Sequence, residues 1–116
     1  MPTARAYRGQ TNHAAGLAAE GIVTRHYQAT GARLLASRWK GPGGEIDLIF
    51  AEGDQTVFVE VKKARSFDTA LQRLGPRQLQ RIAASASAYT SGDMRIDLAV
   101  VDGIGDVQVL KGITLD

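Results

Sequence analysis

The stretch GEIDLIFAEGDQTVFVEVK, residues 44–62, constrains the fold of this chain more than any other segment. Two apolar runs flank Gly53 and Asp54, a pair typical of the two-residue loop of a β-hairpin. With that loop, Asp47 on the first strand lies directly opposite Glu60 on the second. The sequence therefore predicts an antiparallel hairpin that holds two opposed carboxylates among aliphatic neighbours.

Side chains on a strand alternate between its two faces, so residues two apart share a face. The predicted groupings are Glu45 with Asp47, Ile46 with Leu48, Phe58 with Glu60 and Lys62, and Val57 with Val59 and Val61. In the same register, Glu45 is expected opposite Lys62. Lys62 then lies about 7 Å along the strand from Glu60, on the same face.

Facing carboxylates on a hairpin repel each other, because the Cβ atoms of opposed residues are only about 5 Å apart. A divalent cation between Asp47 and Glu60 would turn this repulsion into binding. Mg²⁺ takes carboxylate oxygens, keeps several waters and often shares its ligand shell with phosphate; Mn²⁺ is the alternative ion. Lys62 could then orient the attacking water or neutralise charge on a departing oxygen. The alternative is a half-exposed strand whose charged side chains are simply solvated.

These residues resemble the PD-(D/E)xK nuclease superfamily, whose members carry an Asp, a Glu and a Lys across such a hairpin. The chain is closer still to the YraN-like family of small uncharacterised bacterial proteins, from His13 to about Val101. The segments that carry this resemblance are GLAAEGIVTRHYQATGARLLASRWK, GGEIDLIF, VFVEVKKARS, GPRQLQRIAASASAY and MRIDLAVV. The resemblance implies a roughly αβββαβ core with a metal site at the edge of the sheet.

The resemblance also implies roles for single residues. Asp47, Glu60 and Lys62 match the catalytic triad of the superfamily, and the two acids of that triad are metal ligands. Glu20 matches a helical glutamate that can join the metal shell. The chain departs from the YraN-like pattern at Gln78, where that pattern usually has lysine, and this departure concerns phosphate contacts more than the metal site.

Basic residues follow the hairpin closely, and acids are scarce there. A nucleic-acid backbone beside the metal site would need such positive charge, and arginine suits bidentate phosphate contacts. The candidate nucleic-acid-binding residues are Arg65, Arg73, Arg77, Gln78 and Arg81. The alternative is a solvated basic face of a helix.

The element order predicts a single α/β (α+β) domain over residues 11–116, preceded by a flexible arm over residues 1–10. Helices are expected from Thr11 or Asn12 to about Thr30 and from Pro76 to about Tyr89. Between them, Ser66 is expected to cap a short helical turn. The expected strands are residues 33–39, 44–52, 55–62, 94–101 and 107–110. The order α-β-β-β-α-β-β gives a mixed central sheet flanked by helices, which the resemblance identifies as restriction endonuclease-like.

Three further expectations concern local structure. The core-facing residues of the first helix are predicted to be Ala15, Ala18, Ile22 and Ala29. The glycine-rich residues 41–44 are predicted to form a flexible turn. Asp97, in the middle of a strand, is predicted to be a structural partner of an arginine and not a metal ligand.

The composition is that of an ordinary globular protein, with 44% apolar and 22% charged residues. There is no cysteine, which excludes thiolate metal sites and favours a cytoplasmic location. Neither a secretory signal nor a membrane span is expected, so a membrane partner is not predicted. The net charge of +2 does not by itself indicate a polyanion-binding protein.

Two functions from different classes follow. The first is a metal-dependent nuclease that hydrolyses DNA phosphodiester bonds with Mg²⁺ or Mn²⁺, with branched and repair-intermediate DNA among its candidate substrates. A nuclease of this size that cuts two strands needs a second active site, so a homodimer is expected. The alternative is a non-catalytic nucleic-acid-binding or assembly protein that retains the nuclease fold. An interaction domain with a solvated hairpin is a third, weaker interpretation.

Overall fold

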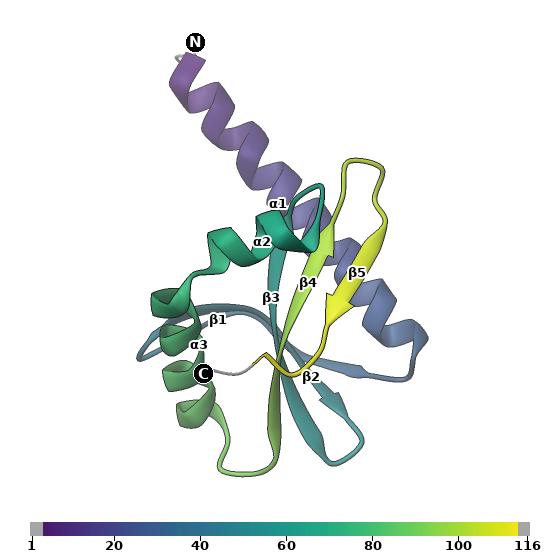
Figure 1. The fold of residues 1–116 in the computed structure, drawn as a ribbon, viewed down its shortest axis with the longest axis vertical. Coiled ribbons are helices and arrows are strands. Elements are labelled where there is room, and N and C mark those ends of the chain that lie inside the picture. Colours follow the sequence, from purple (N-terminus) through teal and green to yellow (C-terminus); the bar gives the residue numbers. More distant parts are fainter. Residues whose placement is uncertain (1–3, 114–116) are drawn as a thin grey trace.

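The structure, a computed structural model, describes residues 4–113, with side chains from residue 16 onward. Within that range the helices are α1 (Ala4–Ala29), α2 (Phe67–Leu74) and α3 (Pro76–Tyr89). The strands are β1 (Arg33–Gly41), β2 (Gly44–Glu52), β3 (Gln55–Lys63), β4 (Met94–Val101) and β5 (Val107–Leu110). The predicted α+β class is confirmed (Figure 1).

The observed order, α-β-β-β-α-α-β-β, contains one helix more than predicted. The predicted short turn after Ser66 is a separate helix, α2, whose first turn is capped by the Ser66 hydroxyl, which accepts a hydrogen bond from the Thr69 amide at 3.2 Å. Gly75, with φ of 44°, ends α2 in a conformation that suits glycine. Pro76 then begins α3, as predicted.

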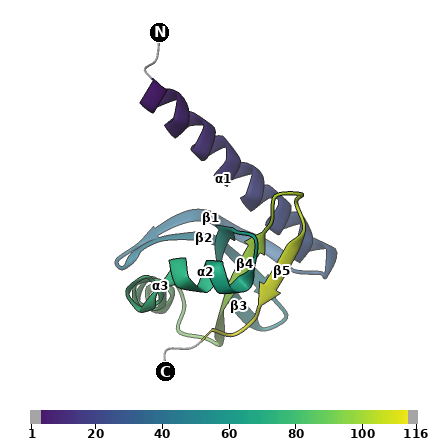
Figure 2. The ribbon, with the colours of Figure 1, turned by 45° about the horizontal axis from the view of Figure 1, so that its top comes forward.

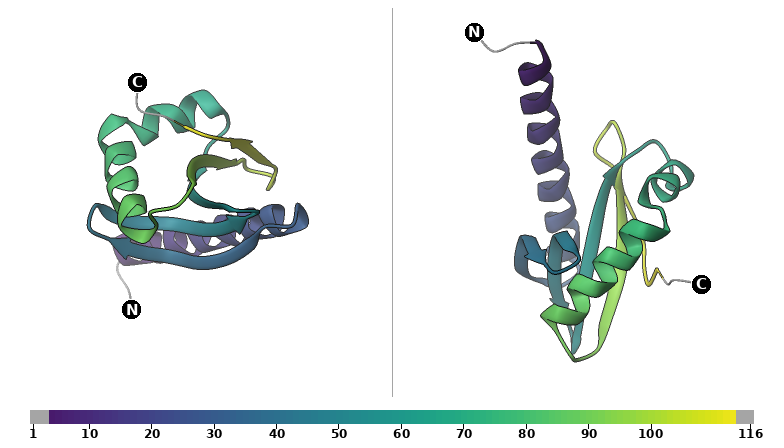
Figure 3. Two further views of the ribbon diagram at one scale, coloured as in Figure 1. Left: turned by 90° about the horizontal axis from the view of Figure 1, so that it is seen from below. Right: turned by 90° about the vertical axis from the view of Figure 1, so that its left-hand side faces the viewer.

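The five strands form one mixed sheet in the order β1-β2-β3-β4-β5. β3 and β4 are parallel, and α2 with α3 forms the crossover between them. Helix α1 lies on one face of the sheet, and α2 and α3 lie on the other (Figure 3).

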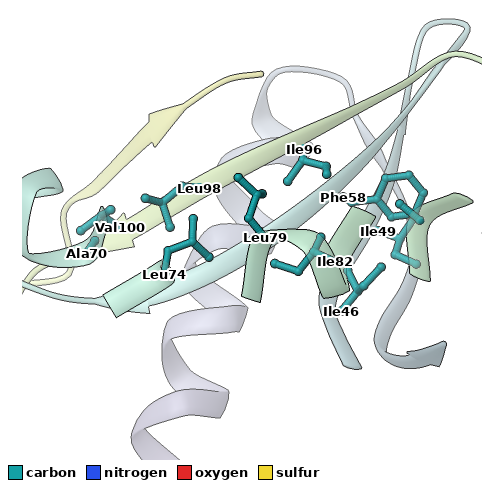
Figure 4. Packing of buried hydrophobic residues seen from close by; sticks show 11 residues of the cluster. Ile46, Ile49, Phe58, Ala70, Leu74, Leu79, Ile82, Ile96, Leu98 and Val100 are labelled. Carbon is teal, nitrogen blue, oxygen red and sulfur yellow. The ribbon is translucent and has the colours of Figure 1, made fainter. Parts of the chain in front are cut away.

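One apolar cluster fills each interface between the helices and the sheet. The α1-side cluster includes Val23, Tyr27, Leu48, Phe50, Val57 and Val59. The α3-side cluster includes Ile46, Ile49, Phe58, Leu74, Leu79, Ile82 and Ile96 (Figure 4). Because both faces are covered, the central strands are buried on both sides.

The prediction of the buried face of α1 is wrong for Ala18 and Ala29 and holds in part for Ile22, which packs against the α1-side cluster. Ala18 and Ala29 are exposed and Ile22 is only partly buried, whereas the side chain of Ala15 lies outside the described residues. The buried positions are instead Ala19, Val23 and Tyr27, one turn apart. Tyr27 determines this choice, because its ring stacks on Phe50 with 4.5 Å between the centroids and its hydroxyl has a buried partner.

Helix α1 begins at Ala4, earlier than predicted, and its first half extends past the sheet (Figures 1 and 3). The predicted flexible arm, residues 1–10, therefore overlaps the first turns of the helix, while residues 1–3 lie outside the described residues. Among residues 4–113, no helix is long and apolar enough to cross a lipid bilayer.

The connection between β1 and β2 is a turn, as predicted, and it is held against α3. Gly41 pairs with Gly44, and the tip of the hairpin lies beside α3 (Figures 1 and 2). The Ser85 hydroxyl on α3 accepts a hydrogen bond from the Gly43 amide and donates one to the Gly44 carbonyl, both at 2.9 Å. The glycines at the tip are needed because α3 lies against the backbone there.

Asp97 is the structural partner of an arginine, as predicted. Arg95 donates to both carboxylate oxygens, from Nε at 2.8 Å and from Nη2 at 3.1 Å. The Tyr27 hydroxyl donates to Asp97 Oδ2 at 2.6 Å, and the Gly112 amide donates to Oδ1 at 3.0 Å. Burial raises the pKa of Tyr27, and the bond to Asp97 raises it further, so Tyr27 stays a neutral donor. This network joins α1 and the C-terminal segment to β4.

Replacing Tyr27 by phenylalanine is expected to lower the free energy of unfolding by about 1.5–3 kcal/mol, because a hydrogen bond to a buried charged group is lost. Urea denaturation at neutral pH measures this change. Tyr89→Phe is the matched control, since the ring contacts of Tyr89 with Trp39 and Phe58 remain. A Tyr27→Phe variant as stable as the control would contradict the proposed role of the network.

Candidate functional site

The β2–β3 hairpin has the predicted two-residue loop, and the predicted register is confirmed from this loop to the pair of Leu48 with Val59. Pairing between the two strands ends at that point. Asp47 and Glu60 are therefore neighbours without being ladder partners, which corrects the prediction that they face each other directly. The separation of β2 from β3 opens the sheet at the place where the carboxylates lie.

Two other features of the predicted β2 geometry are wrong. Glu45 is not paired with Lys62; its partner is Lys40 on β1. Ile46 packs in the α3-side cluster, whereas Leu48 packs in the α1-side cluster, although residues two apart were expected to share a face. The alternation of side chains along β2 is thus interrupted at Asp47.

The Asp47 carboxylate is held at the end of the ladder. Its Oδ2 atom accepts a hydrogen bond from the backbone amide of Val61 at 2.8 Å. A carboxylate oxygen therefore takes the position that a β2 carbonyl would have in a continued ladder. This bond fixes Asp47 between the two strands, next to Glu60.

The predicted face of β3 is confirmed. Phe58 lies in the α3-side cluster, and both Glu60 and Lys62 contact Gln78 on α3. Lys62 Nζ lies 3.2 Å from Glu60 Oε1. The Gln78 amide donates to the same Oε1 atom at 3.0 Å, and its carbonyl accepts from Lys62 Nζ at 3.1 Å. Three side chains thus form a closed triangle over the end of the hairpin.

The two carboxyl groups of the site are costly to ionise together. Glu60 is only 5% exposed, and burial followed by the charge of Asp47 raises the pKa of Glu60 to about 7. Burial also raises the pKa of Asp47. The two carboxyl groups also act on each other, and their interaction raises the pKa of Glu60 while it lowers that of Asp47 against the effect of burial. Near neutral pH the pair therefore favours binding a cation, either a proton or a metal ion.

The donor set fits a hard divalent cation. A cation between Asp47 and Glu60 would remove the repulsion between the carboxylates. Mg²⁺ is commonly held by one or two carboxylates, with water and phosphate completing its shell. Among the described side chains, no group of three or more His, Cys, Asp or Glu residues could hold a metal ion. The candidate centre is therefore a pair and not a triad of carboxylates.

The pH dependence of stability tests the environment of Glu60. Its folded-state pKa of about 7 exceeds the ordinary value of 4.5, so the native state binds more protons than the unfolded state between these values. Stability is therefore highest at low pH in this window and falls as the pH rises from 4.5 to about 7.

Glu60→Gln is expected to remove this pH-dependent loss of stability. Between pH 4.5 and pH 8, the stability of the variant relative to the wild type should therefore rise by up to about 3 kcal/mol. Urea denaturation without divalent ions at several pH values measures the effect. Asp54→Asn, an exposed carboxylate in the hairpin loop, is the control and should keep the wild-type slope. Parallel pH profiles for the wild type and Glu60→Gln would show that Glu60 titrates normally.

Glu20 is placed beside the carboxylate pair and not within it. It forms an ion pair with Arg38, with 3.7 Å between Oε2 and Nε. Together with Glu45 and Arg38 it lines a pocket of about 330 Å³ between α1 and the β1–β2 ribbon. Glu45 is two residues from Asp47 on β2, so this pocket lies near the carboxylate pair.

The predicted nucleic-acid-binding residues divide into two groups. Four of them, Arg73, Arg77, Gln78 and Arg81, line one open pocket of about 580 Å³ at the junction of α2 and α3. Gln78 thus belongs both to this pocket and to the triangle with Glu60. Arg65 lies elsewhere, in a small pocket beside the β4–β5 turn.

Two contributions to the site were missed in the sequence. Gln78 was expected to contact substrate, but its bonds to Glu60 and Lys62 could not be predicted without knowing where α3 lies. The available signal was that Gln78 stands where the YraN-like pattern usually has lysine. Arg38 has a φ of 47° opposite Asp47, and no sequence signal indicated it.

Comparisons with known proteins identify the family of this chain. The profile of the family described as "Uncharacterised protein family UPF0102" matches residues 19–101, which include the carboxylate pair, Lys62 and Gln78. A UPF0102 protein of Ruegeria pomeroyi is 44% identical over 115 residues, covering 93% of this chain and 94% of that protein. A UPF0102 protein of Dinoroseobacter shibae is 44% identical over 122 residues, covering 99% and 91%. The chain therefore belongs to the UPF0102 family.

Proposed function

We propose that this protein is a metal-dependent nuclease of the PD-(D/E)xK superfamily that hydrolyses phosphodiester bonds in DNA. The observation that carries the proposal is the pair of a half-buried Asp47 and a buried Glu60, with the ammonium group of Lys62 3.2 Å from Glu60. Two neighbouring carboxylates withdrawn from water in this way destabilise a sheet unless a cation binds there. An arginine-lined pocket next to this pair supplies the charge that a nucleic-acid backbone needs.

Asp47 and Glu60 would hold Mg²⁺ or Mn²⁺. When bound, the ion supplies charge neutralisation and polarisation at the phosphodiester. Asp47 keeps its bond to the Val61 amide through Oδ2, which leaves its other oxygen available as a ligand. Glu20 assists from the adjoining pocket, where its carboxylate is held by Arg38.

Lys62 and Gln78 act on the attacking and departing oxygens. Lys62 is a donor-only ammonium group, and its bonds to Glu60 and to the Gln78 carbonyl aim it at the centre of the site. In that place it orients the attacking water or neutralises charge on the leaving oxygen. Gln78 holds both partners at fixed distances, so neither reorients freely when substrate binds.

The DNA backbone would follow the arginines of α2 and α3. Arg73, Arg77 and Arg81 lie on the same pocket as Gln78, so a strand whose phosphate reaches Lys62 continues over these side chains. Arg65 is proposed to contact a more distant part of the substrate. Cleavage of both strands of a duplex would require two copies of the site, so a homodimer in the cytoplasm is the proposed working form.

The test is Mn²⁺-dependent cleavage of a labelled panel of linear, flapped, single-stranded and four-way-junction DNA, with Glu60→Ala alongside. We expect the wild type to cleave at least one member and Glu60→Ala to cleave none, while Asp54→Asn cleaves as the wild type does. The preferred member identifies the substrate class. Cleavage that survives in Glu60→Ala would show that the activity does not come from this site.

One observation favours the alternative of a non-catalytic nucleic-acid-binding or assembly protein. The described residues bring no third acid to the carboxylate pair. Binding of the same DNA panel without cleavage of any member, unchanged in Glu60→Ala, would establish that function instead.

A further inference from the structure

Arg38 has an unusual backbone conformation in the middle of β1. Its φ of 47° lies in the left-handed region, and it is the only non-glycine residue with positive φ among those described. Long side chains seldom adopt this conformation, and such residues cluster at functional sites, where surrounding contacts maintain the strain. The guanidinium group is anchored to α1 by the ion pair with Glu20.

The ladder between β1 and β2 is interrupted at the same place. Ser37 pairs with Leu48 and Trp39 pairs with Ile46, but Arg38 and Asp47, which lie between these pairs, are not paired with each other. The interruption therefore involves the strained residue on one strand and the candidate metal ligand on the other.

The two-stranded ribbon turns over across this interruption. On one side Leu48 packs in the α1-side cluster, and on the other side Ile46 and its partner Trp39 pack in the α3-side cluster. A regular strand would place Leu48 and Ile46 on the same face. The register is the same on both sides of Arg38, and the register shift of this ladder lies between Leu34 and Ala36, so the reversal coincides with the left-handed residue and not with that irregularity.

The reversal has a direct effect on Asp47. The residue lies where β2 changes face, and its carboxylate accepts from the Val61 amide beyond the last β2–β3 pair. In an uninterrupted ladder the carbonyls and amides of β2 and β3 would bond to each other, and the Asp47 side chain would stand perpendicular to the sheet.

We propose that the left-handed backbone of Arg38 is the device that positions Asp47: it turns β2 over and directs the carboxylate to the Val61 amide and to Glu60. Arg38 is thus a positioning residue, acting through its backbone from the neighbouring strand. The consequence for metal binding rests on the proposed function. The geometric consequence, the bond from Val61 to Asp47, does not depend on it.

Substitutions that differ in their tolerance of positive φ test the proposal. Arg38→Gly adopts this conformation freely, Arg38→Asn does so readily, Arg38→Ala less so, and Arg38→Val strongly disfavours it because its side chain is β-branched. Ser37→Val is the matched control, since Ser37 is the exposed neighbour of Arg38 and is itself paired, with Leu48.

The first readout is the chemical shift of the Val61 amide proton, because an amide that donates to a carboxylate resonates downfield. We expect Arg38→Gly, Arg38→Asn and Ser37→Val to keep the wild-type position. Arg38→Val should move this resonance upfield more than any other amide of β3, with Arg38→Ala between. If the valine variant does not fold, the comparison of alanine with glycine still decides the question. Loss of the downfield shift in Arg38→Gly, or its retention in Arg38→Ala and Arg38→Val, would overturn the proposal.

The second readout is the rise in melting temperature on adding Mn²⁺. It should be retained in Arg38→Gly and in Ser37→Val and lost in Arg38→Val. A wild-type protein that shows no response to Mn²⁺ would refute the metal site, while the Val61 shifts would still test the positioning role separately. A normal Mn²⁺ response in a folded Arg38→Val variant would refute the positioning role alone.

Discussion

Replacing Lys62 by methionine is expected to slow DNA cleavage by about 10²–10⁴-fold, because a positioned proton-transfer or charge-stabilising group is lost. Methionine retains the unbranched apolar stem, so packing along β3 changes little. Asp47 and Glu60 remain in place, and the rise in melting temperature caused by Mn²⁺ should therefore persist. The measurement is single-turnover cleavage of the preferred DNA substrate, with Mn²⁺ titrated by thermal shift in parallel.

Lys63→Met is the matched control for this variant. Lys63 is the next residue on β3, its side chain is exposed, and it has no bond to the carboxylates among the described contacts. It should cleave at the wild-type rate. If Lys62→Met cleaves as fast as Lys63→Met, Lys62 has no role in the chemistry and the carboxylate pair alone carries the activity.

Gly43→Ala is expected to destabilise the fold by about 3 kcal/mol or more, which is at the upper end for overpacking a core. A Cβ atom at this position would lie 2.2 Å from the Arg81 carbonyl oxygen and 3.0 Å from Ala84 Cβ. The first obstacle is helix backbone, which does not move aside as a flexible side chain would. The hairpin tip must therefore leave α3 and lose both of its hydrogen bonds with Ser85.

The expected loss is measured by urea denaturation, with Gly92→Ala as the control. At Gly92 the nearest atom to an added Cβ is 3.6 Å away, an ordinary contact. We expect Gly92→Ala to change stability by less than about 0.5 kcal/mol, as surface substitutions usually do. Equal stability of the two variants would show that the hairpin tip is not docked on α3.

Much of the hairpin was predictable because its causes are local. The Gly53-Asp54 loop sets the register, and alternation then assigns Glu60 and Lys62 to the side of α3. The caps of α2 and α3 are local as well, since Ser66, Gly75 and Pro76 each act on the helix terminus beside them.

The parts of the fold and of the site that were not predicted depend on contacts between distant segments. The buried face of α1 is one example, because an alanine-rich helix offers several similar faces. Tyr27 is buried because its hydroxyl reaches Asp97, which lies 70 residues further along the chain. The same holds for β2, where the change of face at Asp47 coincides with a strained residue on β1. Strict alternation of side chains along β2 gave no reason to expect this change of face.

The most direct test of the metal site is a crystal structure of the protein grown with Mn²⁺ and measured for anomalous scattering. The account predicts a peak within coordinating distance, about 2.1 Å for such hard cations, of oxygens from both Asp47 and Glu60, with Lys62 still bonded to Gln78. The same crystals of Glu60→Gln should lack this peak. An anomalous peak elsewhere, or a wild-type site without a peak at saturating Mn²⁺, would contradict the proposed metal site.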